Sequence, residues 1–215
     1  MNTKKLYQIR FSDRIKQRYN LWLILIKYFF QKFIDENDTV LDLGCGYGEF
    51  INQINCGKKY AVDLNSDSAK YLSKKVTFYR QSSTKMKSIK SNLTDKIFVS
   101  NFFEHLTRED IILTIQECRR ILKKGGQILI LQPNIRFCEK DYWMFFDHVT
   151  PIDDRALEEV FYSHNFQLKK IILKFLPYTT KSSLPKSSIF IKMYLKFPFL
   201  WRFFGQQSFL IFEKL

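Results

Sequence analysis

Cysteine and long apolar runs are scarce in this sequence. Its 4 cysteines include no Cys-x-x-Cys pair and no histidine at zinc-ligand spacing, so we expect reduced, mostly buried thiols in a cytoplasmic protein. The longest apolar run begins at Leu21, is interrupted by Lys27 and ends at Ile34 after 14 residues, which is too short to cross a bilayer. The first twenty residues are polar and basic and hold no signal-peptide core.

Acidic residues are also few. The chain has 21 Asp and Glu against 35 Lys and Arg, which leaves a net charge of +14. Such an excess favours anionic surroundings such as nucleic acid, anionic lipid or phosphorylated substrates. AT-rich coding, which also favours Ile, Asn and Phe, explains the lysines equally well. The 22 Phe and 11 Tyr predict either a Phe-rich core or an exposed aromatic surface.

Glycine is rare as well, yet three of the 7 glycines alternate within residues 44–48. A β-branched and apolar run at 39–43 precedes them and indicates a buried strand, and apolar residues return at helical spacing over 50–54. A strand, a glycine turn and a helix make room for a ligand at the carboxyl end of a strand. Gly44 and Gly46 permit a positive φ and a close approach of the ligand.

Two carboxylates accompany the glycines. Asp42 lies two residues before Gly44, and Asp63 ends a second apolar run, 60–63, about twenty residues downstream, where an acid in such folds holds ribose hydroxyls. The stretch Leu41–Gly48 resembles the first motif of class I S-adenosylmethionine (SAM)-dependent methyltransferases. Its Gly-x-Gly-x-Gly spacing differs from the Gly-x-Gly-x-x-Gly of dinucleotide-binding folds.

Strand and helix patterns alternate along the rest of the chain, which predicts a doubly wound parallel sheet. The further strands are expected at 59–63, 76–80, 96–100 and 127–131. Helices are expected over 14–34 and over 67–74, the second with Ser66 as its N-cap. A third helix should begin at a Thr107 capping box and stop at Gly125-Gly126, with Lys123 and Lys124 at its negative end. A fourth should run from a Thr150 cap to His164. The resemblance implies a Rossmann-like sheet of seven strands, in which 166–175 and an antiparallel 208–212 form the last hairpin.

The length of 215 residues suits a single domain. We expect an N-terminal arm and helix over 1–35, with the helix packed on the sheet; a membrane-surface helix or a cap over the site is the alternative. A helical insertion over 176–207 separates the last two strands, where hairpin loops usually have about 2–5 residues. Its aromatic residues, interleaved with Lys192, Lys196 and Arg202, predict an acceptor-binding cap or an interfacial membrane anchor. Alternatively, the insertion is a helical hairpin that buries its own apolar side chains and has no binding role.

The resemblance also implies which residues bind SAM. These are Asp42, Gly44, Cys45, Gly46, Gly48, Asp63, Leu64, Gln81, Ser82, Asn101 and Phe102. The glycine loop passes under the methionine portion, Asp63 takes the ribose hydroxyls and Leu64 lies against adenine. Family members commonly carry an Asp near the adenine amino group, and because this chain lacks it, Gln81 or Ser82 must serve there.

The segment Ser100–Leu106 resembles the "LEHL" segment of small-molecule methyltransferases of this class. Asn101 and Phe102 are placed to line the methionine end. Glu104 and His105 are candidates for a catalytic base, for metal ligands as in some quinone-type relatives, or for a structural link at a helix start. Those relatives carry another acid where this chain has Asn101, so we predict no metal.

His148 lies in a long aromatic loop, 132–150, that leaves the ligand edge of the sheet. It could reach an acceptor hydroxyl, with Asp147 fixing its tautomer, or form a hydrogen bond that pins the loop. The predicted catalytic residues are therefore His148, Glu104 and His105.

The predicted activity is methyl transfer to a small or glycan-type acceptor, such as a hydroxyl of a sugar nucleotide or a lipid-linked saccharide. The late segment Phe175–Ser182, with Tyr194-Leu195 and Trp201-Arg202, resembles uncharacterised methyltransferases encoded with bacterial surface-polysaccharide enzymes. Nucleic acid is an unexpected partner because no Asn/Asp-Pro-Pro-aromatic stretch follows the fourth strand. The alternatives are an RNA methyltransferase and a non-catalytic SAM-fold protein at the membrane. The expected location is the cytoplasm, with peripheral contact at an anionic inner membrane face as an option.

Overall fold

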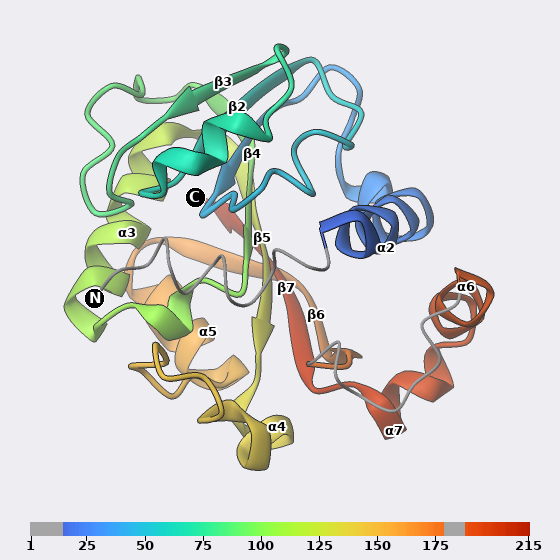
Figure 1. Ribbon diagram of the computed structural model, residues 1–215. Helices are drawn as coiled ribbons and strands as arrows, with labels where there is room; N and C mark the ends of the chain where they lie inside the picture. Colours follow the sequence, from blue (N-terminus) through green and yellow to red (C-terminus); the bar gives the residue numbers. More distant parts are fainter. Residues whose placement is uncertain (1–14, 179–187) are drawn as a thin grey trace.

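A single sheet organises the computed structural model, which describes residues 15–178 and 188–215 (Figure 1). Its strands are β1 (Thr39–Leu43), β2 (Lys58–Val62), β3 (Val76–Tyr79), β4 (Thr94–Ser100), β5 (Leu122–Pro133), β6 (Phe166–Leu176) and β7 (Gln207–Lys214). They lie in the order β3-β2-β1-β4-β5-β7-β6, and β7 is antiparallel to β5 and β6. The predicted seven-stranded α/β sheet with an antiparallel last strand is confirmed.

The strand order reverses between β1 and β4. The chain runs from β1 through β2 to the edge strand β3, and then crosses to β4 on the other side of β1. Ligands of open α/β sheets bind at such a reversal, at the carboxyl ends of the strands. Leu43 of β1 pairs with Val99 of β4, so the loops that begin at Gly44 and at Asn101 start next to each other.

Helices cover both faces of this sheet (Figure 1). They are α2 (Ile15–Tyr28), α3 (Arg108–Ile121), α4 (Ile135–Tyr142), α5 (Asp154–Ser163), α6 (Ser188–Lys196) and α7 (Trp201–Phe204), with 3-10 segments η2 (Phe30–Phe33), η3 (Ser66–Lys70), η4 (Phe103–His105) and η5 (Pro198–Leu200). Trp22 of α2 packs on Phe98 of β4, and Phe30 packs on Phe209 of β7. The first helix therefore lies on the sheet as predicted, and part of the phenylalanine content forms the core.

The helix predicted after the glycine turn does not form. Residues 49–54 make successive turns, although Phe50, Ile51 and Ile54 are buried as their spacing predicts. The Asn52 side chain donates to the Tyr71 carbonyl and accepts from the Ser73 N–H. These two bonds attach the turns to the segment after η3, so this apolar face is buried by turns and not by a regular helix.

Three other helix boundaries differ from the prediction. Asn65, not Ser66, caps η3, because its side chain accepts from the Asp67 N–H. Thr107 caps α3 as predicted, but α3 ends at Ile121 before any glycine, since β5 begins at Leu122 and pairs with Thr94. Lys123 and Lys124 thus belong to a strand and not to the helix end.

The cap of α5 is Asp153 and not Thr150. Its carboxylate accepts from the Ala156 N–H at 2.9 Å. The Thr150 hydroxyl instead donates to the Leu106 carbonyl at 2.6 Å, so Thr150 ties the long loop to the segment after β4.

The described part of the insertion between β6 and β7 contains α6, η5 and α7 and is mostly helical as predicted, whereas residues 179–187 of the predicted insertion lie outside the described residues. Tyr194 of α6 donates its hydroxyl to the Phe175 carbonyl, and Leu195 is buried in the core that also holds Trp22. α6 lies beside α2, with the Lys192 ammonium 5.6 Å from the centre of the Tyr28 ring (Figure 1). No helix within 15–178 or 188–215 is long and apolar enough to cross a membrane.

Candidate active site

The glycine turn after β1 folds over the end of β2. The N–H groups of Gly44 and Cys45 both donate to the Val62 carbonyl, at 2.9 and 3.1 Å. The backbone at Gly44 has a φ of 71°, in the left-handed region that disfavours any side chain. A Cβ on Gly44 would lie 2.4 Å from the Phe102 ring. The turn and the start of the loop after β4 are therefore in direct contact.

Asp63 joins this turn to the next strand. One carboxylate oxygen accepts from the Gly46 N–H at 2.8 Å, and the other accepts from the Asn65 N–H at 2.7 Å. A carboxylate has about four acceptor positions, so two remain for a pair of hydroxyls. Burial raises the pKa of Asp63, against the opposite effect of these backbone hydrogen bonds. The geometry suits the ribose role predicted for Asp63.

Carboxylates gather around the turn in a protein that is strongly basic elsewhere. Burial, and then repulsion from Glu49 and Asp63, raises the pKa of Asp42 well above its ordinary value. Arg18 of α2 reaches Glu49 at 2.6 Å. Burial and the same carboxylates raise the pKa of the Cys45 thiol, which therefore stays protonated. Since SAM carries a sulfonium and an ammonium group, its positive charges complement this negative surrounding.

A second group of polar side chains lies at the ends of β4 and β5. Glu104 and His105 belong to η4, and His148 comes from the loop between α4 and α5. Each of the three residues has one side-chain oxygen or nitrogen that could bind a metal, and these three atoms all lie within 4.8 Å of one another. Glu104 and His148 are buried, and burial raises the pKa of Glu104, with the nearby His105 acting in the opposite sense. The three predicted catalytic residues are thus brought together, although His105 and His148 are 43 positions apart in the sequence.

Each member of this cluster is held by a further residue. Gln132 donates to the Glu104 carboxylate at 2.8 Å. The Nδ1 of His105 lies 3.1 Å from the Asp147 carbonyl oxygen, and the Nε2 of His148 lies 3.0 Å from the Tyr178 hydroxyl.

Comparison with known proteins identifies the segment that carries the first site. Residues 41–130 match the model of the methyltransferase domain family. The match covers less than half of the chain and shows that residues 41–130 resemble a methyltransferase domain. SAM is the cofactor of this domain, and the glycine turn, the Asp63 carboxylate and the surrounding acids fit it. No curated protein sequence matches the chain.

Several solved structures of similar fold are methyltransferases. A SAM-dependent methyltransferase from Archaeoglobus fulgidus is 22% identical, with a TM-score of 0.66 over 92% of this chain and 94% of that one. A Thermotoga maritima protein, described as a possible histamine N-methyltransferase, is 15% identical, with a TM-score of 0.69 over 97% and 98%. A geranyl diphosphate C-methyltransferase from Streptomyces coelicolor is 15% identical, with a TM-score of 0.62 over 88% and 77%. At these identities the likeness is one of fold.

The remaining residues predicted to bind SAM lie in the loops that follow β2, β3 and β4. The side chain of Asn101, which has a φ of 49°, donates to the Ser100 hydroxyl. Leu64 follows β2 and is 63% exposed, so its side chain is accessible to a ring. Gln81 accepts from the Ser88 N–H, and the Ser82 hydroxyl bonds Thr84. Both side chains are thus engaged within their own loop.

Gly48 lies against the segment that follows η3. A Cβ at this position would lie 2.5 Å from the Leu72 side chain. The close neighbour is therefore the segment after η3, because the helix expected after Gly48 is absent.

Sequence reasoning missed Gln132, Tyr178 and Arg80. Arg80 approaches the Leu64 carbonyl at 3.3 Å, at the end where adenine is expected. All three residues lie at or just beyond the carboxyl end of a strand, β5, β6 and β3 respectively. That position was the available signal, since ligand sites of such sheets are built from these ends.

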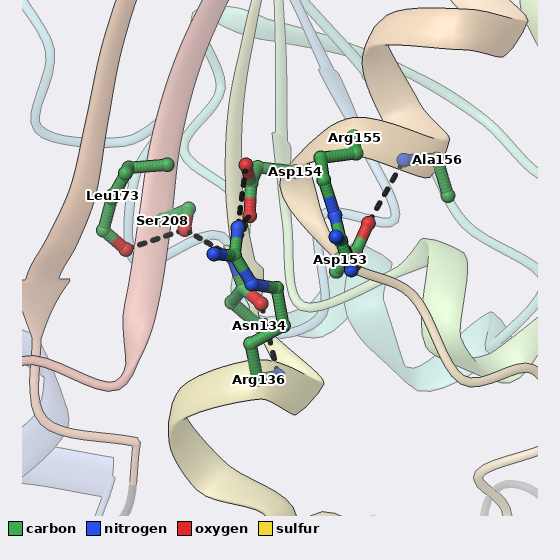
Figure 2. A network of polar contacts seen from close by, with 8 residues as sticks. All are labelled: Asn134, Arg136, Asp153, Asp154, Arg155, Ala156, Leu173 and Ser208. Carbon is green, nitrogen blue, oxygen red and sulfur yellow. Dashed lines mark hydrogen bonds and ion pairs between the residues drawn. The ribbon is translucent and has the colours of Figure 1, made fainter.

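A buried polar network fixes the loop that carries His148 (Figure 2). The Asn134 side chain donates to Asp154 at 2.6 Å and to Ser208 at 2.9 Å, and Ser208 donates to the Leu173 carbonyl. Arg136 pairs with Asp154 at 2.9 Å. The segments that flank the loop, at the start of α4 and at the start of α5, are thereby attached to each other and to β6 and β7.

Proposed function

We propose that this protein is a SAM-dependent methyltransferase that methylates a hydroxyl of a small or glycan-type acceptor, such as a sugar nucleotide or a lipid-linked saccharide. The observation that carries the proposal is the pairing of two sites on adjacent strands: the glycine turn with Asp63 after β1, and the Glu104–His105–His148 cluster after β4. SAM supplies an activated methyl group, and the chain must align it with the acceptor and exclude water. A hydroxyl must also lose its proton, which is the role of the cluster.

The surroundings of the cluster suit an acceptor with an apolar part. Trp143, Phe146 and Val149 flank His148 in its loop and are more than half exposed. The Phe145 ring lies edge-on to Tyr178, with ring centres 5.8 Å apart. A lipid-linked saccharide would place its chain against such side chains. The likeness in fold to an enzyme whose substrate is a prenyl diphosphate is compatible with this choice.

We also propose that the insertion makes peripheral contact with an anionic membrane. Its large exposed apolar side chains include Ile189, Met193, Phe197, Phe199 and Phe203. Lys192, Lys196 and Arg202 lie among them, and no Asp or Glu occurs anywhere between Val160 and Phe212. Apolar and basic side chains together are what an interfacial helix presents to anionic lipid. The protein would then act as a single domain at the inner face of the membrane.

Co-sedimentation tests this membrane contact. The protein should pellet with phosphatidylglycerol vesicles and much less with phosphatidylcholine vesicles. Replacing Ile189 and Phe203 with serine should weaken the binding at least fivefold. Leu113→Ser, which changes an exposed apolar residue of α3, is the matched control and should bind as the unaltered protein does. Equal binding by all three proteins would rule out the insertion as the contact surface.

The enzymatic proposal is tested by product identification. The protein, incubated with methyl-labelled SAM and a cell extract, should label a saccharide or its lipid-linked form as an alkali-stable methyl ether. His148→Ala should abolish turnover and leave SAM binding unchanged, whereas His164→Ala, at the end of α5, should retain activity. Labelled RNA would contradict the proposed acceptor. Failure to bind SAM in calorimetry would contradict the enzymatic activity itself.

A further inference from the structure

The cluster of Glu104, His105 and His148 has the composition of a metal site. Two imidazoles and one carboxylate form a ligand set that binds first-row transition metals with open positions left for substrate. The ligand atoms lie within 4.8 Å of one another, and the Glu104 Oε1 is 3.9 Å from the His105 Nε2. Ligands about 2.1 Å from a shared ion are roughly 3 to 3.5 Å apart, so a small inward movement completes the site.

The surrounding hydrogen bonds follow the pattern of a metal centre. Side chains that bind a metal usually have their other polar atom held by a neighbouring group. Here the second carboxylate oxygen of Glu104 accepts from Gln132, and the Nδ1 of His105 faces the Asp147 carbonyl. The Nε2 of His148 bonds the Tyr178 hydroxyl. These hydrogen bonds hold the three side chains close to the positions that a shared ion would require.

The charge balance also favours a cation. Glu104 is 1% exposed, and within the described residues its one ion pair is with His105. The Asp147 carboxylate lies 3.4 Å from the same imidazole. A cation is attracted to a site where two carboxylates lie this close to one imidazole, and a divalent ion fits that requirement.

We propose that Glu104, His105 and His148 bind one divalent transition-metal ion of the Mn²⁺, Fe²⁺, Co²⁺ or Zn²⁺ type. Mg²⁺ and Ca²⁺ are poor candidates because they prefer oxygen ligands. The side chain of His105 keeps 29% exposure, so an oxygen from outside can reach the ion. The prediction that no metal binds was based on residues close to Glu104 in the sequence. The fold brings His148 to the same place as a third candidate ligand.

The catalytic consequence rests on the proposed function. A hydroxyl bound to the ion loses its proton more readily. The acceptor O–H bond breaks and its proton passes to solvent; the O–CH3 bond then forms as the S–CH3 bond breaks, and sulfur keeps the electron pair. The chain's contribution is to hold the ion beside the glycine turn.

Metal binding is measured first, without turnover. The full chain, freed of metal by chelation, is titrated with Co²⁺ and Mn²⁺ by calorimetry, and Co²⁺ binding is followed by its visible absorption. We expect one ion per chain and a tenfold or greater loss of affinity in His105→Gln and in His148→Gln. His164→Gln changes the third histidine of the chain, and it should bind metal as the unaltered protein does. SAM affinity verifies that each variant is folded.

The outcomes separate this inference from the proposed function. Absence of a one-to-one site, or equal metal affinity in all three variants, would overturn the metal site. Methyl transfer that persists in the chelated protein would also overturn its catalytic role while leaving the transferase proposal intact. A site that binds Co²⁺ in a protein without transferase activity would support the metal inference and count against the proposed function.

Discussion

Asp63→Ala is the substitution that tests the SAM site most directly. Two acceptor positions of the Asp63 carboxylate remain for the ribose hydroxyls, and a hydrogen bond to a charged group contributes about 1.5–3 kcal/mol. Two such bonds set an upper limit of about 3–6 kcal/mol, but water replaces part of the loss. We therefore expect SAM affinity to fall at least tenfold, which corresponds to about 1.4 kcal/mol.

The same substitution should also lower stability. The N–H groups of Gly46 and Asn65 lose their acceptor, and an unsatisfied buried donor costs about 1–3 kcal/mol. Calorimetry at a temperature well below the unfolding midpoint separates affinity from stability. Asp95→Ala is the matched control, because Asp95 also accepts from a backbone N–H, that of Thr39, but near the beginning of β4. It should lower the melting temperature without changing SAM affinity.

An unchanged affinity in folded Asp63→Ala would remove Asp63 from the ribose site. An equal loss in Asp95→Ala would show that the effect is a general consequence of lower stability. Either result would refute the assignment.

Further substitutions test the turn around this site. Asp42→Asn should raise the melting temperature at pH 7, because burial and the nearby carboxylates Glu49 and Asp63 disfavour the ionised form of Asp42. Since folding raises the pKa of Asp42, the unaltered protein loses stability as the pH rises through that raised pKa. The gain from the substitution should therefore vanish below pH 3.8, the ordinary pKa of the group. Gly44→Ala should weaken SAM binding, and it should destabilise the protein more than Gly125→Ala does. Both glycines have a φ of 71°, but of the two only Gly44 has another side chain where the added Cβ would lie. Comparable thermal shifts and SAM affinities in the two variants would contradict the packing of the Phe102 ring on the turn.

The prediction of the architecture succeeded where a pattern is local and repeated. β1 was predicted at its observed bounds, because an apolar strand followed by glycines is a signal confined to a few residues. The capping of α3 by Thr107 is local in the same sense. The segment after Gly48 was predicted as a helix from its apolar spacing, but it forms turns that the Asn52 side chain attaches to residues 71 and 73. Such partners are invisible to a local reading.

The sequence alone was enough to predict the sheet class, the glycine turn and the positions proposed for SAM, because all of these depend on residues close together in the chain. It could not show that Glu104, His105 and His148 meet, nor that Gln132 and Tyr178 hold them. These residues come from the ends of different strands and their loops, and only the packing of the sheet brings the ends to one place. The tertiary structure therefore decides how the proposed acceptor site is built, whereas the proposed SAM site can be predicted from a short motif.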